Sequence, residues 1–363
     1  MKQKGLFEGL NFMLEKKNIL LALATTFLAS IMGLILVETY FWKSNDNFFV
    51  CEICQFHPQL GWETIPGKTV SNEKVTYTTN SLGMRSKEVD FSKGHILLVG
   101  DSVTFGLGVN NDETVSHYLG KINNDYQVLN LGVPGYGIGQ YFLNLKRHID
   151  QLNPKIIVLV IYTANDLNET RKGTRFGISK PFFSYNNGNL IYLNPEISKF
   201  SCSNLYSRSR FLKHITPTLL KDQCKTRVIE RNKASPTIAK LIDGIRVLGM
   251  EKNISTLIVL SPALKAVERV TCKQNKDKDS CMNFDPGFED YYKYFSLMMD
   301  LYKLPHIDFL KTLVEYNKKN EITFLYGNKG EDIHHYSPQG NALLAQTISN
   351  RLDIATTGKI TLK

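Results

Sequence analysis

An uncharged apolar stretch near the N-terminus is the feature that most constrains how this chain folds. Residues 18–37, from Asn18 to Val37, contain no charged side chain. As a helix, a stretch of this length is long enough to cross the hydrocarbon core of a bilayer. Lysines outnumber acidic residues before it, so the positive-inside rule places residues 1–17 in the cytoplasm and the chain beyond the stretch outside. We therefore predict a single-pass protein with an uncleaved anchor at 18–37. A cleaved signal peptide, whose apolar region is normally shorter, is the alternative.

The six cysteines all lie after this stretch, as expected for a domain in an oxidising compartment. The predicted disulfides join sequence neighbours: Cys51 with Cys54, Cys202 with Cys224, and Cys272 with Cys281. A redox-active or metal-binding pair at Cys51 and Cys54 is the alternative. Gln55 stands where haem attachment needs a histidine, and no fourth ligand accompanies the first pair and His57. We expect structural disulfides, and neither a metal nor a cofactor.

The chain has a formal net charge of +10, but its lysines and arginines are scattered, and no long basic run with interleaved aromatic residues occurs. This distribution argues against a nucleic-acid partner. A basic surface that faces an anionic membrane or glycan stays open as an alternative to a simply solvated surface. With 363 residues, 42% of them hydrophobic, the chain suffices for one large domain or two small ones.

Residues 38–93 are polar and rich in turn residues, and they predict a stalk that then packs on the following domain, with a hairpin over 70–79. From residue 94 onward, buried strands alternate with helices, which predicts an α/β fold of three layers (α/β/α) with a mostly parallel sheet. The predicted strands are 96–99, 126–131, 155–162, 255–260 and 306–309, and the predicted helices are 114–123, 140–152, 235–252 and 338–352. We expect one domain over 94–352, an insertion at 167–234 over the end of the sheet, and a tail at 353–363.

Two glycine-containing turns follow the first two predicted strands. The apolar run 96–99 ends in Gly-Asp-Ser, which places Ser102 at the carboxyl end of a strand, where ligands of open α/β sheets bind. Ordinary turn chemistry is the alternative. After the second strand, the glycine-rich segment 130–139 brings backbone N–H groups close to a ligand. It matches neither phosphate-binding nor dinucleotide-binding patterns, and the Gly132 amide suits an oxyanion equally well.

Two further segments carry side chains suited to ester chemistry. Asn165 closes the third predicted strand at the same sheet edge, and an asparagine amide is a good oxyanion donor, although a helix cap explains it equally well. Asp332 and His335 lie three residues apart, before a Ser-Pro helix start at 337–338, and a catalytic histidine needs such a carboxylate to orient its ring. His334 is expected at the surface or behind the site, because adjacent residues of an extended loop point to opposite sides.

Taken together, the four segments resemble the SGNH hydrolases, also called the GDSL family of esterases and lipases, over roughly residues 79–352. The segments that match the family's four blocks are Gly100-Asp101-Ser102, Gly132, Asn165 and Asp332-x-x-His335. The third block departs from the family pattern, since Thr163 stands where a glycine is usual. The resemblance implies the flavodoxin-like SGNH fold, a triad of Ser102, His335 and Asp332, and an oxyanion hole formed by the Ser102 and Gly132 amides and the Asn165 side chain. Asp101 and Asp166 are assigned to structural hydrogen bonding.

The expected function is hydrolysis of O-acyl esters, chiefly acetyl esters, on cell-envelope glycans of a bacterial periplasm, without a cofactor. We expect the loop that carries Tyr136 to lie beside the serine. The segment from Asn80 to Arg85 resembles a feature of membrane-anchored family members of uncertain substrate. Two alternatives stay open. The same triad suits acyl transfer to a sugar hydroxyl, and a glycan-binding module with an idle triad is the non-catalytic interpretation.

Overall fold

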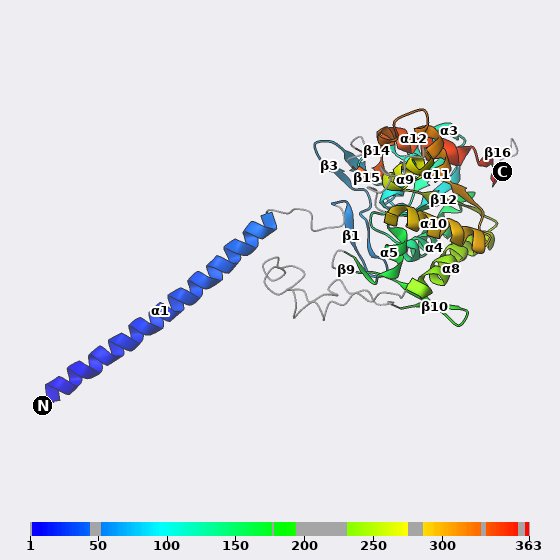
Figure 1. Cartoon of the computed structure of the whole chain (residues 1–363). Coiled ribbons are helices and arrows are strands. Elements are labelled where there is room, and N and C mark those ends of the chain that lie inside the picture. Colours follow the sequence, from blue (N-terminus) through cyan, green and yellow to red (C-terminus); the bar gives the residue numbers. More distant parts are fainter. Residues whose placement is uncertain are drawn as a thin grey trace. The chain divides into compact units, whose positions relative to one another are not determined.

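A computed structural model describes residues 2–43, 52–175, 178–193, 231–274, 286–327, 332–354 and 360–362 (Figure 1). Contacts divide the chain into two units, and helix α1 (Lys2–Lys43) is the described part of the first. Within α1, residues Lys16–Leu36 have a mean hydropathy of 2.4, and their side chains are exposed. This stretch is long and apolar enough to cross a membrane. The helix runs beyond both ends of the predicted anchor.

The second unit is built on a sheet of five parallel strands in the order β13-β12-β7-β5-β6. The strands are β5 (Gly94–Val99), β6 (Tyr126–Asn130), β7 (Ile156–Tyr162), β12 (Ser255–Ser261) and β13 (His306–Asp308). Numbered along the chain, this order is 2-1-3-4-5, the flavodoxin-like arrangement, whose ligands bind where the strand order reverses. The predicted fold class is confirmed, and the reversal lies at β5, the strand that leads to Ser102.

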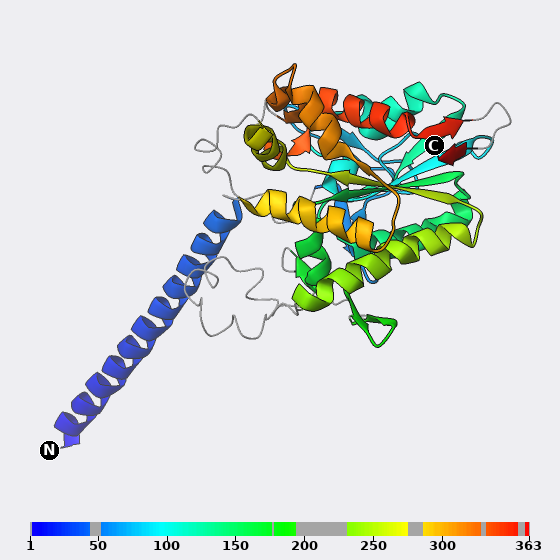
Figure 2. The ribbon, with the colours of Figure 1, turned by 45° about the vertical axis from the view of Figure 1, so that its right-hand side comes forward.

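Helices cover both faces of the sheet (Figure 2). Helices α3 and α12 pack together on one face, and α4 and α8 pack together on the other. The helices of this unit are α2 (Ser102–Phe105), α3 (Val115–Ile122), α4 (Ile138–Leu152), α5 (Asp166–Arg171), α8 (Arg231–Met250), α9 (Leu264–Gln274), α10 (Pro286–Leu301), α11 (Phe309–Asn317) and α12 (Pro338–Ser349), with 3-10 turns at Asn111–Glu113 and Ile322–Leu325. Every residue of β7 is buried, because neighbouring strands pair with both of its edges and helices cover both faces.

Short antiparallel pairs surround the sheet. They are β1 (Cys54–His57) with β2 (Gly61–Thr64), β3 (Thr69–Ser71) with β4 (Thr76–Thr78), β8 (Thr174–Arg175) with β9 (Ile178–Ser179), β10 (Phe183–Asn186) with β11 (Asn189–Tyr192), β14 (Tyr326–Gly327) with β15 (Asp332–Tyr336), and β16 (Leu352–Ile354) with β17 (Ile360–Leu362). The pair β3–β4 is the predicted hairpin. Pairs β8–β9 and β10–β11 fall within the predicted insertion, and its residues 194–230 lie outside the described part of the chain. The predicted tail contributes β17.

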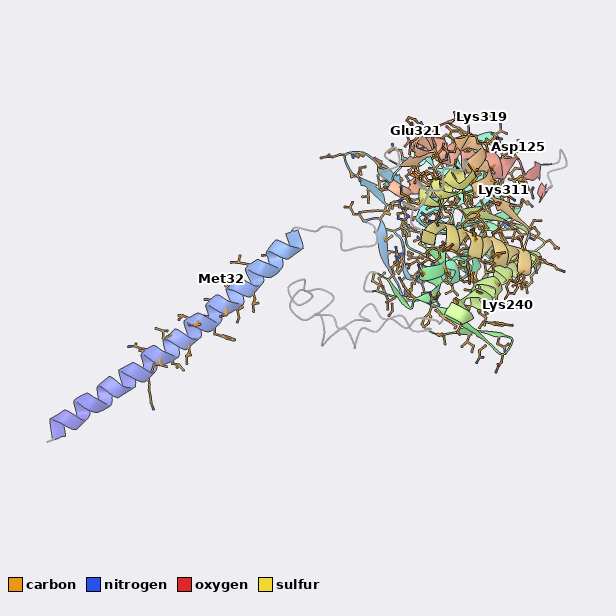
Figure 3. All side chains as sticks on the ribbon, viewed as in Figure 1. Met32, Asp125, Lys240, Lys311, Lys319 and Glu321 are labelled. Atoms are coloured by element: carbon orange, nitrogen blue, oxygen red, sulfur yellow. The ribbon has the colours of Figure 1, made fainter. Side chains whose placement is uncertain are left out.

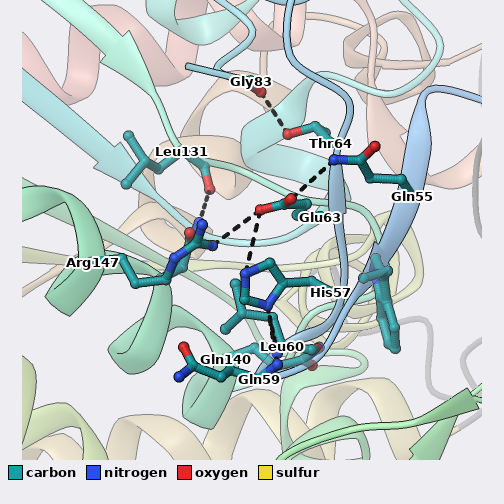
Figure 4. A network of polar contacts seen from close by, with 12 residues as sticks. Gln55, His57, Gln59, Leu60, Glu63, Thr64, Gly83, Leu131, Gln140 and Arg147 are labelled. Atoms are coloured by element: carbon teal, nitrogen blue, oxygen red, sulfur yellow. Dashed lines mark hydrogen bonds and ion pairs between the residues drawn. The ribbon is translucent and has the colours of Figure 1, made fainter. Parts of the chain in front are cut away.

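The segment before the sheet is an integral part of the domain. Trp62 of β2 is fully buried, and its Nε1 donates to the Pro134 carbonyl oxygen at 2.9 Å. Glu63, the next residue, accepts hydrogen bonds from Gln55 at 3.0 Å and from Arg147 of α4 at 3.1 Å (Figure 4). Residues from β1 and β2 onward therefore contact the same unit that holds the five-stranded sheet, and the division of 38–93 into a stalk and a packing segment stays a prediction.

Charged side chains are spread around the second unit. Lys240 on α8 and Lys319 after α11 lie on opposite sides of it (Figure 3). Of the six cysteines, Cys54 and Cys272 lie within the described residues, and both are disulfide-bonded. Cys51, Cys202, Cys224 and Cys281 lie outside the described residues, so the predicted pairing stays a prediction.

Candidate active site

Ser102 begins the four-residue helix α2 directly after β5. A Cβ at Gly100 would lie 2.0 Å from Thr104 Oγ1 and 2.9 Å from the Val160 carbonyl oxygen, so only glycine lets α2 turn back this tightly over β7. Asp101 caps α2, because its Oδ1 accepts from the Val103 N–H at 2.9 Å. The serine hydroxyl is therefore held at the carboxyl edge of the sheet, and the residue is 7% exposed.

His335 and Asp332 reach the serine from β15, at the far end of the chain. His335 Nε2 lies 2.9 Å from Ser102 Oγ, and His335 Nδ1 lies 2.8 Å from Asp332 Oδ2. The other oxygen of Asp332 accepts from the backbone N–H groups of His334 and His335 at 3.0 and 3.1 Å. The three predicted side chains thus form one chain of hydrogen bonds, the arrangement of a serine nucleophile, a general base and an orienting carboxylate.

The charge of Asp332 is matched to this position. Burial by itself raises the pKa of this carboxyl group, but the hydrogen bonds from the His335 ring and from the two backbone N–H groups outweigh it. The pKa is lowered to about 2. Asp332 is therefore ionised at neutral pH, where it fixes the His335 ring with Nδ1 protonated and Nε2 toward the serine. Ser337 then starts α12 as predicted, with its Oγ accepting from the Gly340 N–H at 3.2 Å.

His334 lies beside the chain of hydrogen bonds rather than in it. The residue is exposed overall, its ring is partly covered by Tyr162, and its ring centroid lies 6.4 Å from that of His335. Burial raises the pKa of Tyr162 well above its ordinary value, so the phenol stays protonated and donates to His334 Nδ1 at 2.8 Å. Burial also lowers the pKa of His334, which favours its neutral ring. Within the described residues, no group of three or more His, Cys, Asp or Glu side chains is placed to hold a metal ion.

Asn165 lies next to α2, as the family resemblance predicts. Its Nδ2 donates to Asp101 Oδ2 at 3.1 Å, and its Oδ1 is buried without a hydrogen-bond partner within the described residues. A carboxylate accepts hydrogen bonds and donates none, so Asp101 selects the orientation in which the nitrogen of the Asn165 amide faces α2. One N–H of the amide is used by Asp101, and the other stays available to a ligand.

Gly132 also lies against α2, but its amide is already engaged. The Gly132 N–H donates to Asn130 Oδ1 at 2.9 Å, so an oxyanion has to share this hydrogen or displace the Asn130 oxygen. A Cβ at Gly132 would lie 2.3 Å from the Phe105 nitrogen, which explains the glycine. Asn130 itself was not singled out from the sequence. Its Nδ2 donates to the Thr104 carbonyl oxygen at 2.7 Å, and its place at the end of β6, two residues before Gly132, was the available signal.

Asp166 has the structural role that we predicted. It is fully buried, accepts from the Tyr141 hydroxyl at 2.6 Å and from the Tyr162 N–H at 2.9 Å, and so ties α4 to the end of β7. Burial raises its pKa well above the ordinary value, and the nearby charge of Asp101 adds to the effect. The segment that carries Tyr136 also contains Gly132, which lies against α2, but the Tyr136 side chain points into the core. The ring is fully buried, and its hydroxyl donates to the Trp62 carbonyl oxygen, so it offers no surface beside the serine.

Comparison with known proteins gives a distant likeness in fold. No family model and no curated protein matches the sequence. Among solved structures, an acetyl xylan esterase, AlAXEase, is 14% identical with a TM-score of 0.40, over 70% of this chain and 98% of that one. The lipase/acylhydrolase from Enterococcus faecalis is 16% identical with a TM-score of 0.40, over 74% and 98%. A lipolytic protein of the G-D-S-L family from Veillonella parvula DSM 2008 is 15% identical with a TM-score of 0.39, over 70% and 96%.

Proposed function

We propose that this chain is a serine esterase of the SGNH type. The observation that carries the proposal is the unbroken hydrogen-bonded chain from Ser102 Oγ through the His335 ring to Asp332 Oδ2, with distances of 2.9 and 2.8 Å. Three residues from opposite ends of the domain meet at the sheet edge where ligands of this fold class bind. An idle triad in a binding module has no need of this geometry, nor of an Asp332 whose pKa is lowered to about 2.

The proposed reaction has two halves. Ser102 Oγ attacks the ester carbonyl carbon while His335 Nε2 accepts the serine proton, and Asp332 stabilises the imidazolium that forms. The bond to the leaving oxygen then breaks, His335 gives its proton to that oxygen, and an alcohol departs from an acyl-Ser102 enzyme. In the second half, His335 takes a proton from water, the hydroxide attacks the acyl carbon, and the carboxylic acid leaves as Ser102 regains its proton.

The proposed oxyanion hole consists of the Ser102 amide, the Gly132 amide and the Asn165 side chain. Ser102 is the first residue of α2, so its N–H has no acceptor within that helix. Asn165 Nδ2 has one hydrogen beyond the one it donates to Asp101. Gly132 takes part by sharing its N–H between Asn130 Oδ1 and the oxyanion. Loss of one such donor typically lowers turnover by about 10²- to 10³-fold.

The proposed substrates are O-acyl esters, chiefly acetyl esters, on cell-envelope glycans. Helix α1 supports this placement, because it exposes a long apolar surface that a bilayer would bury and that tethers the chain to a membrane. The disulfide-bonded state of Cys54 and Cys272 suits the outer side of that membrane, such as a bacterial periplasm. The net charge of +10 suits anionic envelope material.

The test is hydrolysis by the full-length chain in detergent, first of p-nitrophenyl acetate and then of an O-acetylated polysaccharide, with labelling by a fluorophosphonate probe. We expect Ser102→Ala to abolish turnover and labelling while the melting temperature stays near that of the wild type. Ser261→Ala is the matched control, because Ser261 is a buried serine whose hydroxyl bonds the Tyr336 hydroxyl and none of the three proposed triad side chains. Full activity in Ser102→Ala would refute the proposal.

The same assay separates hydrolysis from acyl transfer. If added glycan releases the acyl group from Ser102 faster than water does, and the acyl group appears on the glycan, the enzyme is a transferase with the same nucleophile. If the release rate is independent of glycan and free acid accumulates, it is a hydrolase.

A further inference from the structure

Arg85, the last residue of the Asn80–Arg85 segment, is buried beside the nucleophile helix. The residue is 3% exposed, although a guanidinium normally lies in water. Burial lowers its pKa to about 10, which leaves the group charged at neutral pH. Its carbon atom Cζ lies 4.6 Å from the ring centroid of Tyr77 and 4.8 Å from that of Phe105. A cation between two aromatic faces is held in one plane.

The nitrogen atoms of Arg85 bind the backbone that follows Ser102. Nη1 donates to the Phe105 carbonyl oxygen at 2.9 Å and to that of Gly106, and Nη2 donates to the Val109 carbonyl oxygen at 2.5 Å. Nε donates to Asn111 Oδ1 at 2.9 Å. One side chain therefore gathers the end of α2 and the loop behind it into a single arrangement, which the planar fork of a guanidinium does and an ammonium does not.

The carbonyl groups of α2 link Arg85 to Ser102. The Asp101, Ser102 and Val103 carbonyl oxygens accept from N–H groups within the turn itself. The carbonyl groups of Thr104 and Phe105, at the end of the helix, accept from Asn130 and Arg85. That of Gly106, the C-cap, accepts from Arg85 and from the Val109 N–H at 3.4 Å. Buried carbonyl groups need such partners, so the conformation of α2 depends on side chains from outside it.

The hairpin β3–β4 supports the Arg85 side chain from the opposite side. Tyr77 of β4 stacks on the guanidinium, and its hydroxyl accepts from the Gly108 N–H at 3.1 Å. The Thr76 and Thr78 N–H groups donate to the Asn110 and Asn111 side chains at 3.0 and 3.2 Å. The hairpin, Arg85 and the loop after α2 are therefore one connected unit.

We infer that Arg85 is a positioning residue for the nucleophile, which acts through the backbone of α2 to keep Ser102 Oγ within hydrogen-bond distance of His335 Nε2. The inference rests on the proposed esterase function, and it assigns a role in that reaction to a segment outside the four family-like blocks. Arg85 touches no reacting atom. Its loss shifts α2, and a misplacement of about 1 Å in a reacting group lowers turnover by about 10²-fold.

The variants are made in the full-length chain. Arg85→Met keeps the side-chain length without donors, and we expect kcat on p-nitrophenyl acetate to fall about 10²-fold with KM within about threefold, because the substrate site keeps its other contacts. Arg85→Lys keeps the charge without the fork, and we expect a fall in kcat of about tenfold. In Arg85→Ala, added guanidinium at concentrations that do not denature is expected to restore part of kcat, and ammonium is not.

Gln140→Met is the matched control. Gln140 is 1% exposed, and its Nε2 donates to the Leu60 carbonyl oxygen at 2.8 Å. Like Arg85→Met, this variant removes a buried side-chain donor to a backbone carbonyl group. Unlike Arg85, Gln140 does not bond α2. A merely structural role predicts that both variants lose stability and that neither changes kcat. Wild-type kcat in folded Arg85→Met overturns the inference, and if that variant does not fold, wild-type kcat in Arg85→Lys overturns it.

Amide hydrogen exchange over residues 101–110 gives a readout that does not need activity. We expect exchange in this segment to be at least tenfold faster in Arg85→Met than in Gln140→Met, because the α2 turn loses its outside partners. If the wild type hydrolyses no ester and labels with no fluorophosphonate, the proposed function fails, and exchange alone then decides the effect of Arg85 on α2. Equal exchange in the two variants overturns that effect whether or not the enzyme is active.

Discussion

We expect replacement of Asp101 by asparagine to turn the side-chain amide of Asn165 by 180°, so that its oxygen and nitrogen exchange places, without removing any heavy atom from the site. In the native chain, Asp101 Oδ1 is fixed by the Val103 N–H and Oδ2 faces Asn165 Nδ2 at 3.1 Å. An asparagine at position 101 keeps the cap with its oxygen, so its own Nδ2 takes the place of Oδ2. Two N–H groups then face each other, and the Asn165 amide relieves this by turning its Oδ1 toward position 101.

The turn exchanges an oxyanion donor for an acceptor. Loss of one such donor costs about 10²- to 10³-fold in kcat, or about 2.7–4 kcal/mol. In the native chain, the Asn165 side-chain oxygen is buried and has no hydrogen-bond partner within the described residues, which costs about 1–3 kcal/mol. In the variant, this oxygen gains the position 101 amide as a donor. We therefore expect Asp101→Asn to keep or slightly raise the melting temperature while kcat falls as far as it does in Asn165→Ala.

A double-mutant cycle distinguishes this mechanism from general damage. Because both variants remove the same donor, Asp101→Asn with Asn165→Ala is expected to be no slower than either single variant, measured as kcat on p-nitrophenyl acetate. Asp166→Asn is the matched control, since Asp166 is also a buried aspartate, but it bonds Tyr141 and the Tyr162 N–H instead of Asn165. We expect the fold-loss in kcat of Asp166→Asn to multiply with the fold-loss of Asn165→Ala in the double variant. Multiplicative losses in the Asp101 cycle would refute the reasoning.

Three further predictions concern a buried histidine, a buried tryptophan and the glycine that packs against α2. Burial lowers the pKa of His148 from its ordinary 6.5 to about 4, so the folded state binds fewer protons than the unfolded state in this window and stability falls by up to about 3 kcal/mol as the pH drops through it. His148→Gln is expected to flatten this dependence in urea unfolding at pH 7 and pH 4.5. Trp62→Ala is expected to cost about 3–5 kcal/mol in the same assay, because the ring is fully buried, and a change below 1 kcal/mol would contradict its place in the core. Gly132→Ala places a Cβ 2.3 Å from the Phe105 nitrogen, so we expect kcat to fall more than stability does, as measured by turnover and thermal melting.

The sheet and the contact between Ser102, His335 and Asp332 were predictable because their signals are local. The runs at 96–99 and 156–161 are too apolar for a surface and too short for a helix, and the parallel order brings their carboxyl ends to one edge. Ser102 and Asn165 follow these runs directly. His335 follows Asp332 at the spacing that lets one carboxylate accept hydrogen bonds from both the ring and the backbone N–H of His335. Short-range rules and strand order were sufficient to bring these four residues to one sheet edge, and the resemblance to the SGNH hydrolases supplied their proposed roles.

The hydrogen-bonding state of the proposed oxyanion donors was not predictable, because it depends on which polar groups meet in the fold. The sequence indicates that Gly132 offers a backbone N–H, but not that the Asn130 side chain reaches forward two residues to accept it. Likewise, the sequence indicates an amide at Asn165, and only the carboxylate of Asp101 decides which end of that amide faces the serine. Such choices cost or gain only about 1–3 kcal/mol each and leave no periodic pattern in the sequence.

The role of Arg85 shows the same limit over a longer range, and it changes how the N-terminal segment is understood. A single arginine in a polar, turn-rich stretch is normally a surface residue, and its contacts with Phe105, Gly106 and Val109 are separated from it by about twenty residues of sequence. A four-residue helix cannot satisfy its own last carbonyl groups, so the need for an outside donor is already present in the shortness of the Gly-Asp-Ser turn. The segment predicted as a stalk supplies that donor. The proposed nucleophile is therefore supported by two parts of the sequence. A fragment that begins after Arg85 is expected to contain Ser102, His335 and Asp332 without the support that aligns them.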